Sequence, residues 1–125
     1  MTERHLQEPT RLLLTALADA PRHGYAIIQE VLAISEGRVR LQTGTLYTAL
    51  DRLLQQGLIQ VHAEEVVNGR MRRSYALTEA GRDTLATETE SLRRTVLEAE
   101  RRLAHRPGPV GRGAAGRPGP GAVTA

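Results

Sequence analysis

The chain has 125 residues, of which 25% are charged, and it contains neither cysteine nor lysine. This length supports one small domain, and the sequence has no run of about 18 apolar residues that could span a membrane. The lack of cysteine excludes disulfides and thiolate chemistry, and acidic residues precede the first apolar stretch, which is atypical of a signal peptide. We therefore expect a cytoplasmic protein with no membrane partner.

The formal net charge of +3 does not by itself indicate a nucleic-acid partner. Residues 1–105 contain 14 arginines and all 14 acidic residues, whereas residues 106–125 contain three arginines and no acid. The part that can fold is neutral overall, so a claim of DNA binding depends on where its arginines cluster.

Two helices are expected before residue 38. Apolar side chains over residues 11–18 predict a first helix that ends before Pro21, because the residue preceding a proline is disfavoured in the helical region. A second helix should run from about Gly24 to residues 35–37. Its expected core-facing side chains are Tyr25, Ile28, Val31 and Leu32. Residues 38–41 alternate polar and apolar side chains, which is consistent with a short strand.

A third helix is expected from Thr43, whose hydroxyl can cap free amides, to Gly57. Leucines recur on one face of it at the helical period: Leu46, Leu50, Leu53 and Leu54. The opposite face carries small or polar side chains that can reach base edges or phosphates: Thr45, Thr48, Arg52 and Gln55. A helix that serves only as scaffold more often has a Glu/Lys-rich solvent face.

The apolar period changes from 3.6 to two directly after Gly57. Ile59, Val61 and Ala63 alternate with polar residues before the turn signal Asn68-Gly69, and Tyr75 and Leu77 alternate after it. The pattern predicts a β-hairpin attached to a three-helix core. Three arginines cluster beside its tip: Arg70, Arg72 and Arg73. They could bind phosphates or enter a narrow minor groove, or they could protect an exposed hairpin edge against aggregation.

A long helix follows Thr78, which is a suitable N-cap. Apolar or small residues recur in it at alternating intervals of four and three, as in a heptad seam: Leu85, Thr89, Leu92, Val96, Ala99 and Leu103. A helix of roughly 40 Å outreaches so small a body, so we expect this seam to join two copies. The alternative is that the stripe packs on the chain's own core, as the part near Leu85 should.

Three ordered motifs resemble the PadR family of bacterial transcriptional regulators. They are His23-Gly24-Tyr25, then Gly44-Thr45-Leu46-Tyr47 with Ala49-Leu50, Leu53 and Gly57-Leu58-Ile59, and finally Gly69-Arg70 through Arg72-Arg73 and Tyr75 to Leu77-Thr78-Glu79-Ala80-Gly81. The resemblance covers residues 10–104, and the single helix after the hairpin is similar to the smaller PadR subfamily. One departure is Thr48, where the family commonly has proline.

The resemblance implies a mostly α fold with a small β-hairpin (α+β). A winged helix-turn-helix would occupy residues 10–78 and a C-terminal dimerisation helix residues 79–105, with an N-terminal extension over 1–9. The Gly/Pro/Arg tail over 106–125 has no family counterpart, and its composition predicts disorder because it cannot bury enough to fold. The family further implies a homodimer that binds a palindromic operator in double-stranded DNA, usually as a repressor relieved by a small-molecule effector. We expect such an effector in the apolar space between paired helices near Leu92 and Val96.

Within that frame the outward side chains of the third helix would meet base edges, and Arg52 is the best candidate for a bidentate guanine contact. Its alternatives are an intrahelical ion pair or simple solvent exposure. Tyr47 and Thr43 are better placed for phosphates.

No catalytic residues, metal ligands or cofactor motif stand out, and His23 is interpreted as structural. A second hypothesis is a winged-helix module that binds protein through the same surface. Protein interfaces usually bury aromatic anchors, but this chain has no Trp, no Phe and three Tyr, so a regulator is favoured.

Overall fold

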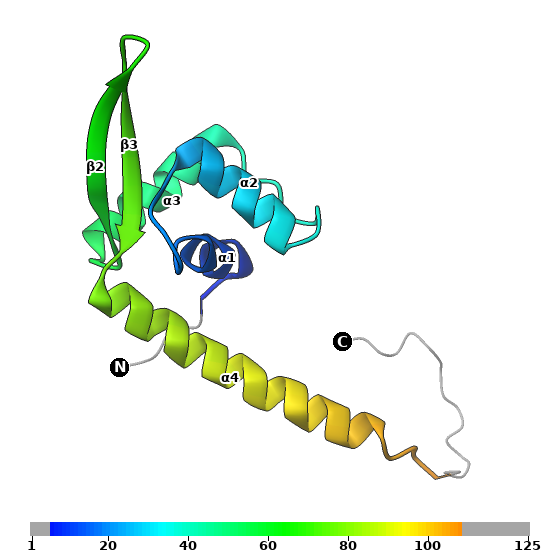
Figure 1. The fold of residues 1–125 in the computed structure, drawn as a ribbon. Helices are drawn as coiled ribbons and strands as arrows, with labels where there is room; N and C mark the ends of the chain where they lie inside the picture. Colours follow the sequence, from blue (N-terminus) through cyan, green and yellow to red (C-terminus); the bar gives the residue numbers. More distant parts are fainter. Residues whose placement is uncertain (1–5, 109–125) are drawn as a thin grey trace. The chain divides into compact units, whose positions relative to one another are not determined.

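The computed structural model describes residues 6–108 and has four helices and three strands (Figure 1). Its elements are α1 (Glu8–Ala16), β1 (Arg22–His23), α2 (Gly24–Ile34), α3 (Thr43–Gln55), β2 (Ile59–Val67), β3 (Arg70–Leu77) and α4 (Glu79–Leu103). The chain divides into two units between Ser91 and Leu92, so the first unit ends inside α4. Residues 1–5 of the expected N-terminal extension and 109–125 of the expected tail lie outside the described residues.

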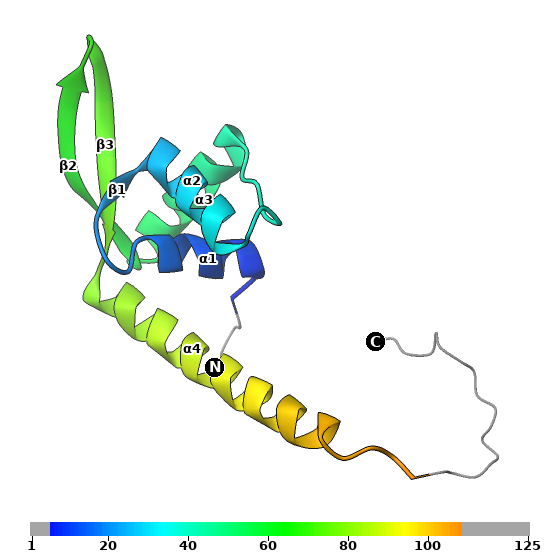
Figure 2. The same ribbon diagram turned by 45° about the vertical axis from the view of Figure 1, so that its right-hand side comes forward.

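Helices α1, α2 and α3 pack around a core of leucines, on one side of the hairpin (Figures 1 and 2). The largest fully buried side chains are Leu13, Leu14, Leu17, Ile27, Val31, Leu46, Leu50 and Leu53. Burial of each such side chain contributes about 1.5–3 kcal/mol, which is the main force that holds the three helices together. The architecture confirms the expected α+β fold.

Helix α1 begins at Glu8, three residues before the predicted start, and it ends at Ala16 rather than residue 18. Pro9 is tolerated inside its first turn because the first amides of a helix have no intrahelical acceptor. The predicted boundary between an extension and a domain at residues 9 and 10 therefore falls inside a helix. Arg38 binds the Glu8 carboxylate at 2.7 and 3.0 Å, which joins this helix start to the segment after α2.

The core-facing stripe of α2 differs from the predicted one. Gly24, Ile27 and Val31 are buried, whereas Tyr25 is 66% exposed, so the assignment of Tyr25 to the core was wrong. Successive helical residues are about 100° apart, and a stripe with the 24, 27, 31 spacing turns residue 25 away from the core. Ile28 is only partly buried.

The predicted short strand at residues 38–41 is absent, because this segment is a loop. Helix α2 ends in a Schellman motif, with Glu36 and Gly37 at positive φ and the Gly37 amide donating to the Leu32 carbonyl at 2.8 Å. The Val39 amide then donates to the Ser35 hydroxyl at 2.9 Å instead of to a neighbouring strand. The sheet edge along β3 is taken by β1.

Helix α3 has the predicted apolar stripe, since Leu46, Leu50 and Leu53 are buried. Gln42 occupies the N-cap position without a side-chain hydrogen bond, and Thr43 is already helical, so the capping role predicted for Thr43 was wrong. At the other end, Gly57 at φ 76° and the Leu58 amide bound to the Leu53 carbonyl form a second Schellman motif. The prediction that Gly57 stops the helix is confirmed.

Strands β2 and β3 form the predicted hairpin, and β1 adds to it in the order β1-β3-β2. Asn68 and Gly69 both have positive φ, as a two-residue type I′ turn requires. The alternation predicted for β3 is confirmed, with Tyr75 and Leu77 buried. In β2 it fails beyond Ile59, since residues 60–66 are all exposed. An extra residue between Val61 and Ala63 also shifts the register of this strand.

The start of α4 is fixed by the predicted cap. The Thr78 hydroxyl accepts from the Gly81 amide at 3.0 Å and donates to the Gly57 carbonyl at 2.6 Å. Arg11 of α1 lies 3.7 Å from the nearly buried Glu88 carboxylate, which ties this part of α4 to the helical core. Within residues 6–108, no helix is both long and apolar enough to cross a membrane.

Candidate nucleic-acid interface

The buried leucines of α3 determine which side chains of the helix face outward. Because the leucine stripe is buried, the opposite face must be turned outward, and Thr45, Thr48 and Gln55 are all exposed there. Thr43 is exposed at the first turn. These side chains combine short hydroxyl groups with one amide, and such groups can hydrogen-bond to base edges or phosphate oxygens without a change in the helix.

Arg52 does not join this group in the structure. Its Nη2 atom lies 3.5 Å from the Thr10 hydroxyl of α1. Arg52 is therefore on the flank of α3 that faces the first helix. The structure therefore places this guanidinium apart from the wing and from Tyr47. A contact with guanine would require the side chain to leave Thr10.

The β2–β3 hairpin, hereafter the wing, carries its arginines in unequal surroundings. Arg73 stands opposite Glu64 and binds its carboxylate at 2.8 Å, and Arg72 stands opposite Glu65 in the strand register. Arg70 stands opposite Val67 next to the turn. The charge on Arg73 is largely balanced within the wing, whereas Arg70 has no acid across the ladder from it.

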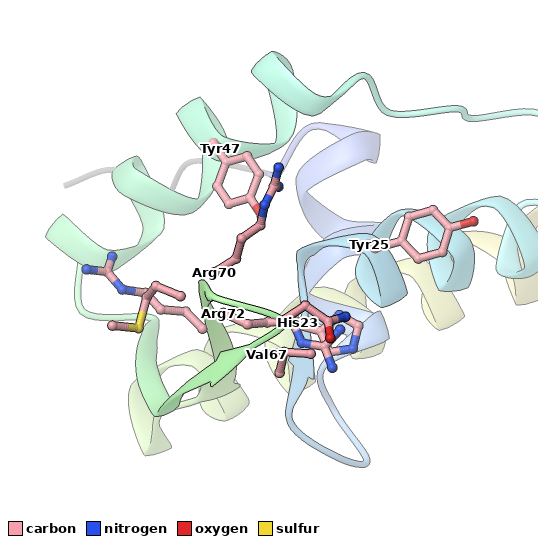
Figure 3. A pocket seen from close by; sticks show the side chains of 9 residues that line it. His23, Tyr25, Tyr47, Val67, Arg70 and Arg72 are labelled. Atoms are coloured by element: carbon pink, nitrogen blue, oxygen red, sulfur yellow. The ribbon is translucent and has the colours of Figure 1, made fainter.

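An open groove of about 470 Å³ lies between the wing, Tyr47 of α3 and the start of α2 (Figure 3). It is lined by His23, Tyr25, Tyr47, Val67, Asn68, Arg70, Met71, Arg72 and Arg73. The structure thus brings the three predicted wing arginines together with Tyr47 of α3. Among residues 6–108 no acidic residue lines the groove, which presents cationic and hydroxyl-bearing side chains beside the apolar Val67 and Met71.

Tyr47 reaches this groove because Gly24 has no side chain. A Cβ atom at Gly24 would overlap the Tyr47 hydroxyl and lie 3.0 Å from its ring carbon Cζ. Tyr47 is 43% exposed, so part of its ring packs against α2 while the rest faces the groove. The close approach of α2 and α3 therefore determines where this hydroxyl is presented.

Tyr75 lies buried at the foot of the wing, and burial raises the pKa of its phenol, although hydrogen bonding to Arg73 acts in the opposite direction. The phenol stays protonated at neutral pH. The hydrogen bond to the Glu64 carboxylate, at 2.8 Å, raises the pKa of Arg73.

Sequence analysis missed two groove residues, His23 and Tyr25. His23 was interpreted as structural and Tyr25 as core, but both line the groove. The Tyr25 hydroxyl accepts a hydrogen bond from Gln29 Nε2 at 3.1 Å, on the exposed side of α2. The signal that could have identified Tyr25 is the helical spacing of Gly24, Ile27 and Val31, because a core-facing stripe of these three residues turns residue 25 outward.

The residues predicted for dimerisation lie along α4. Leu85 packs partly against the core, whereas Leu92, Val96 and Leu103 are 40%, 52% and 80% exposed, and Thr89 and Ala99 are exposed as well. Leu97, which was not predicted, is 58% exposed. No group of three or more potential metal ligands occurs among residues 6–108.

A family model of PadR-like transcriptional regulators matches residues 13–87. The transcriptional regulator Rv3488 of Mycobacterium tuberculosis is 38% identical over 86 residues, which make up 69% of this chain and 77% of that protein. An uncharacterized 37.1 kDa protein in transposon TN4556 of Streptomyces fradiae is 43% identical over 83 residues. This match covers 66% of the chain described here but only 22% of the Streptomyces protein.

Solved structures share the fold. A PadR family transcription regulator from Clostridium difficile R20291 superposes with a TM-score of 0.63 at 23% identity, over 79% of this chain and 100% of that one. Bacillus subtilis PadR in complex with operator DNA superposes with a TM-score of 0.58 at 18% identity, over 65% of this chain and 47% of that one. At these identities the likeness concerns the fold alone.

Proposed function

The chain belongs to the PadR-like family of transcriptional regulators, and from this membership we propose that it binds duplex DNA in the cytoplasm through α3 and the wing. The family is one of regulators and not of enzymes. The observation that carries the proposal is a juxtaposition: Tyr47 of α3 and the arginines of the wing line one open groove, and the outward face of the same helix is polar and exposed. A major groove of about 12 Å admits one helix, and a flanking hairpin can then reach the backbone or the minor groove.

The side chains divide by the contacts they can make. Thr45, Thr48 and Gln55 are assigned to base edges because they lie on the outward face of α3. Phosphate contacts are assigned to the groove and the helix start, where guanidinium and hydroxyl groups gather. They are Thr43, Tyr47, Arg70, Arg72 and Arg73. Arg52 is a base contact only in a conformation that releases Thr10.

We further propose that two copies bind a palindromic operator, with the exposed apolar side chains of α4 forming the seam. Exposed apolar side chains recurring along one helix are typical of an interaction surface. A two-fold dimer presents two recognition helices to half-sites one helical turn or a multiple apart. Such a dimer at a promoter would act as a repressor by occupying the DNA, and a small-molecule effector that weakens its binding would relieve repression.

The test compares wing variants on an operator duplex and on a random duplex by fluorescence anisotropy. The Arg72→Ala/Arg73→Ala double variant should weaken binding to both duplexes and flatten the dependence of log K on log salt by about one unit per lost phosphate contact. The matched control is Arg101→Ala/Arg102→Ala, which removes the same charge from α4, outside the groove. Unchanged affinity and slope in the wing variant would remove the wing from the mechanism.

The alternative function is a winged-helix module that binds protein. The same anisotropy titration of the wild-type chain distinguishes the two functions. If the alternative holds, the chain binds no duplex DNA even at low salt.

A further inference from the structure

Two exposed apolar side chains lie next to each other near the tip of the wing. Val66 of β2 and Met71 of β3, hereafter the apolar pair, stand directly opposite each other in the ladder and are 67% and 60% exposed. Directly opposed residues of an antiparallel ladder project from the same face of the ribbon and lie close enough to interact. Only Val67 and Arg70 separate the apolar pair from the turn. The wing therefore carries an apolar surface close to its tip.

The packing of the fold does not account for the apolar pair. In the described part of the chain, neither the core nor the partly buried residues around it include Val66 or Met71. The buried side chains of the wing lie at its foot, and they are Ile59, Tyr75 and Leu77. Valine is favoured in strands as a β-branched residue, but methionine is not among the residue types that strands favour. An exposed apolar surface on a hairpin is a liability for aggregation unless a partner covers it.

The charges beside the apolar pair fit duplex DNA as that partner. Arg70 and Arg72 flank Met71 along β3, and because side chains alternate along a strand, they project from the other face of the ribbon. Arg70 stands opposite Val67, whereas the other two wing arginines stand opposite acids. In Figure 3 the Arg70 side chain extends from the wing toward Tyr47 of α3. A duplex can satisfy both faces of the ribbon, with phosphates for the arginine and base planes for the apolar pair.

The width of the ribbon determines how the apolar pair could reach base planes. The minor groove of B-DNA is about 6 Å wide. Two paired strands are about 4.8 Å apart and carry side chains on both faces, so residues behind the turn reach the base pairs only if the groove widens. Minor-groove proteins widen it by inserting an apolar side chain between two base pairs, which partly unstacks them and kinks the duplex by about 20–90°. A methionine suits this role, since its unbranched, polarizable side chain adapts to an irregular gap.

We propose that the apolar pair enters the minor groove beside the half-site and partly unstacks one base step, with Met71 as the inserted side chain and Arg70 bound to an adjacent phosphate. The proposal rests on the proposed function, because it requires α3 and the wing to be on DNA. Pyrimidine–purine steps such as TA unstack most easily, whereas runs of A paired with T are stiff. The wing would therefore select a deformable step without a hydrogen bond to a base edge.

The experiment uses two duplexes of equal length and base composition, one with alternating T and A and one with a run of A paired with T. Wild type is compared with Val66→Thr/Met71→Thr, which keeps residues that favour strands and removes the inserted side chain. Anisotropy at low salt measures affinity, energy transfer between dyes at the duplex ends measures bending, and the fluorescence of aminopurine in place of one adenine measures unstacking.

Wild type should bind the alternating duplex several-fold more tightly than the stiff one, and it should raise both the energy transfer and the aminopurine signal. The double variant should still bind through its arginines but raise neither signal. It should also lose the preference for the alternating duplex, because the narrow minor groove of the stiff duplex itself attracts arginine.

Two further variants serve as controls. Met71→Leu keeps an apolar side chain of similar size, and it should bend and unstack the alternating duplex as wild type does. Val61→Thr makes the same valine change at a 37% exposed position further from the tip of the wing, and it should leave bending and preference unchanged.

The possible failures of the two proposals can be told apart. A wild-type protein that binds no duplex would overturn the proposed function together with this inference. A wild type that binds both duplexes and bends neither, or a double variant that bends and prefers DNA as wild type does, would overturn this inference alone. A double variant that bends DNA normally but associates with itself less than wild type would assign the apolar pair to a contact between copies.

Discussion

At the scale of single residues, Tyr47 can take its position because Gly24 has no side chain to block it. Gly24→Ala would place a methyl group against the Tyr47 hydroxyl, which is the far end of a partly exposed side chain and can move. We expect unfolding free energy to change by no more than about 1 kcal/mol, because alanine also favours the helix. DNA affinity should fall several-fold, because the hydroxyl is displaced from the groove.

Urea unfolding and anisotropy together test this separation of stability from binding. Tyr47→Phe is the control, since it deletes the hydroxyl and leaves Gly24 in place, and it should also lose affinity. A Gly24→Ala protein that binds DNA as tightly as wild type would show that Tyr47 is not a contact.

Glu64 offers a gain-of-affinity test for the wing. Glu64→Gln removes the carboxylate that binds Arg73 at 2.8 Å, so the guanidinium can bind phosphate without first giving up its ion pair. We expect several-fold tighter binding to any duplex for this reason. Glu100→Gln removes the same charge from α4, and an equal gain there would attribute the effect to net charge rather than to Arg73.

At the scale of elements, the sequence was most informative where local signals decide the structure. Helix α3 and the hairpin were predicted because a leucine period, Gly57 and Asn68-Gly69 act within a few residues of one another. Strand β1 could not be predicted, since Arg22 and His23 are a strand only by virtue of pairing with β3. The single false strand, at residues 38–41, had the right alternation, but its Val39 amide is bound by the Ser35 hydroxyl.

Part of the candidate site could also be predicted from local sequence signals. The outward residues of α3 and the wing arginines follow from period and turn signals. The inequality among those arginines could not be foreseen, because it depends on the register shift between Val61 and Ala63 that places Glu64 opposite Arg73. The placement of Arg52 beside Thr10 is a tertiary contact across 42 positions of sequence.

Alanine substitutions at Gly81 and Gly44 should change the unfolding free energy in opposite directions. A Cβ atom at Gly81 would overlap the backbone carbonyl of Leu58, which cannot move without displacing the start of α4. Gly81→Ala should therefore lower the unfolding free energy by about 1–3 kcal/mol. Gly44, which has open space around its Cβ position in α3, should tolerate alanine or gain up to about 1 kcal/mol. Chemical denaturation measures both, and similar values would refute the proposed contact.

At the scale of the whole molecule, the proposed dimer depends on the exposed stripe of α4. Leu92→Arg would bring two like charges into an apolar seam, at a cost of several kcal/mol in lost burial and repulsion. We expect the variant to sediment as a monomer and to lose tight operator binding, since each subunit would bind its half-site separately. Leu97→Arg is the comparison, because it places the same charge elsewhere on the exposed surface of α4. A wild-type monomer that binds its operator tightly would contradict the two-half-site mechanism.

The most direct measurement of the central claim is to sequence the duplexes that the purified wild-type protein retains from a random pool. The account predicts enrichment of an inverted repeat whose half-sites are one helical turn or a multiple apart, because two copies of α3 would read equivalent base edges. Enrichment should disappear in a protein with Thr45, Thr48 and Gln55 replaced by alanine, while weak, salt-sensitive binding through the wing persists. A retained pool with no enriched sequence, or one enriched identically by that variant, would contradict the assignment of α3 as the element that reads DNA.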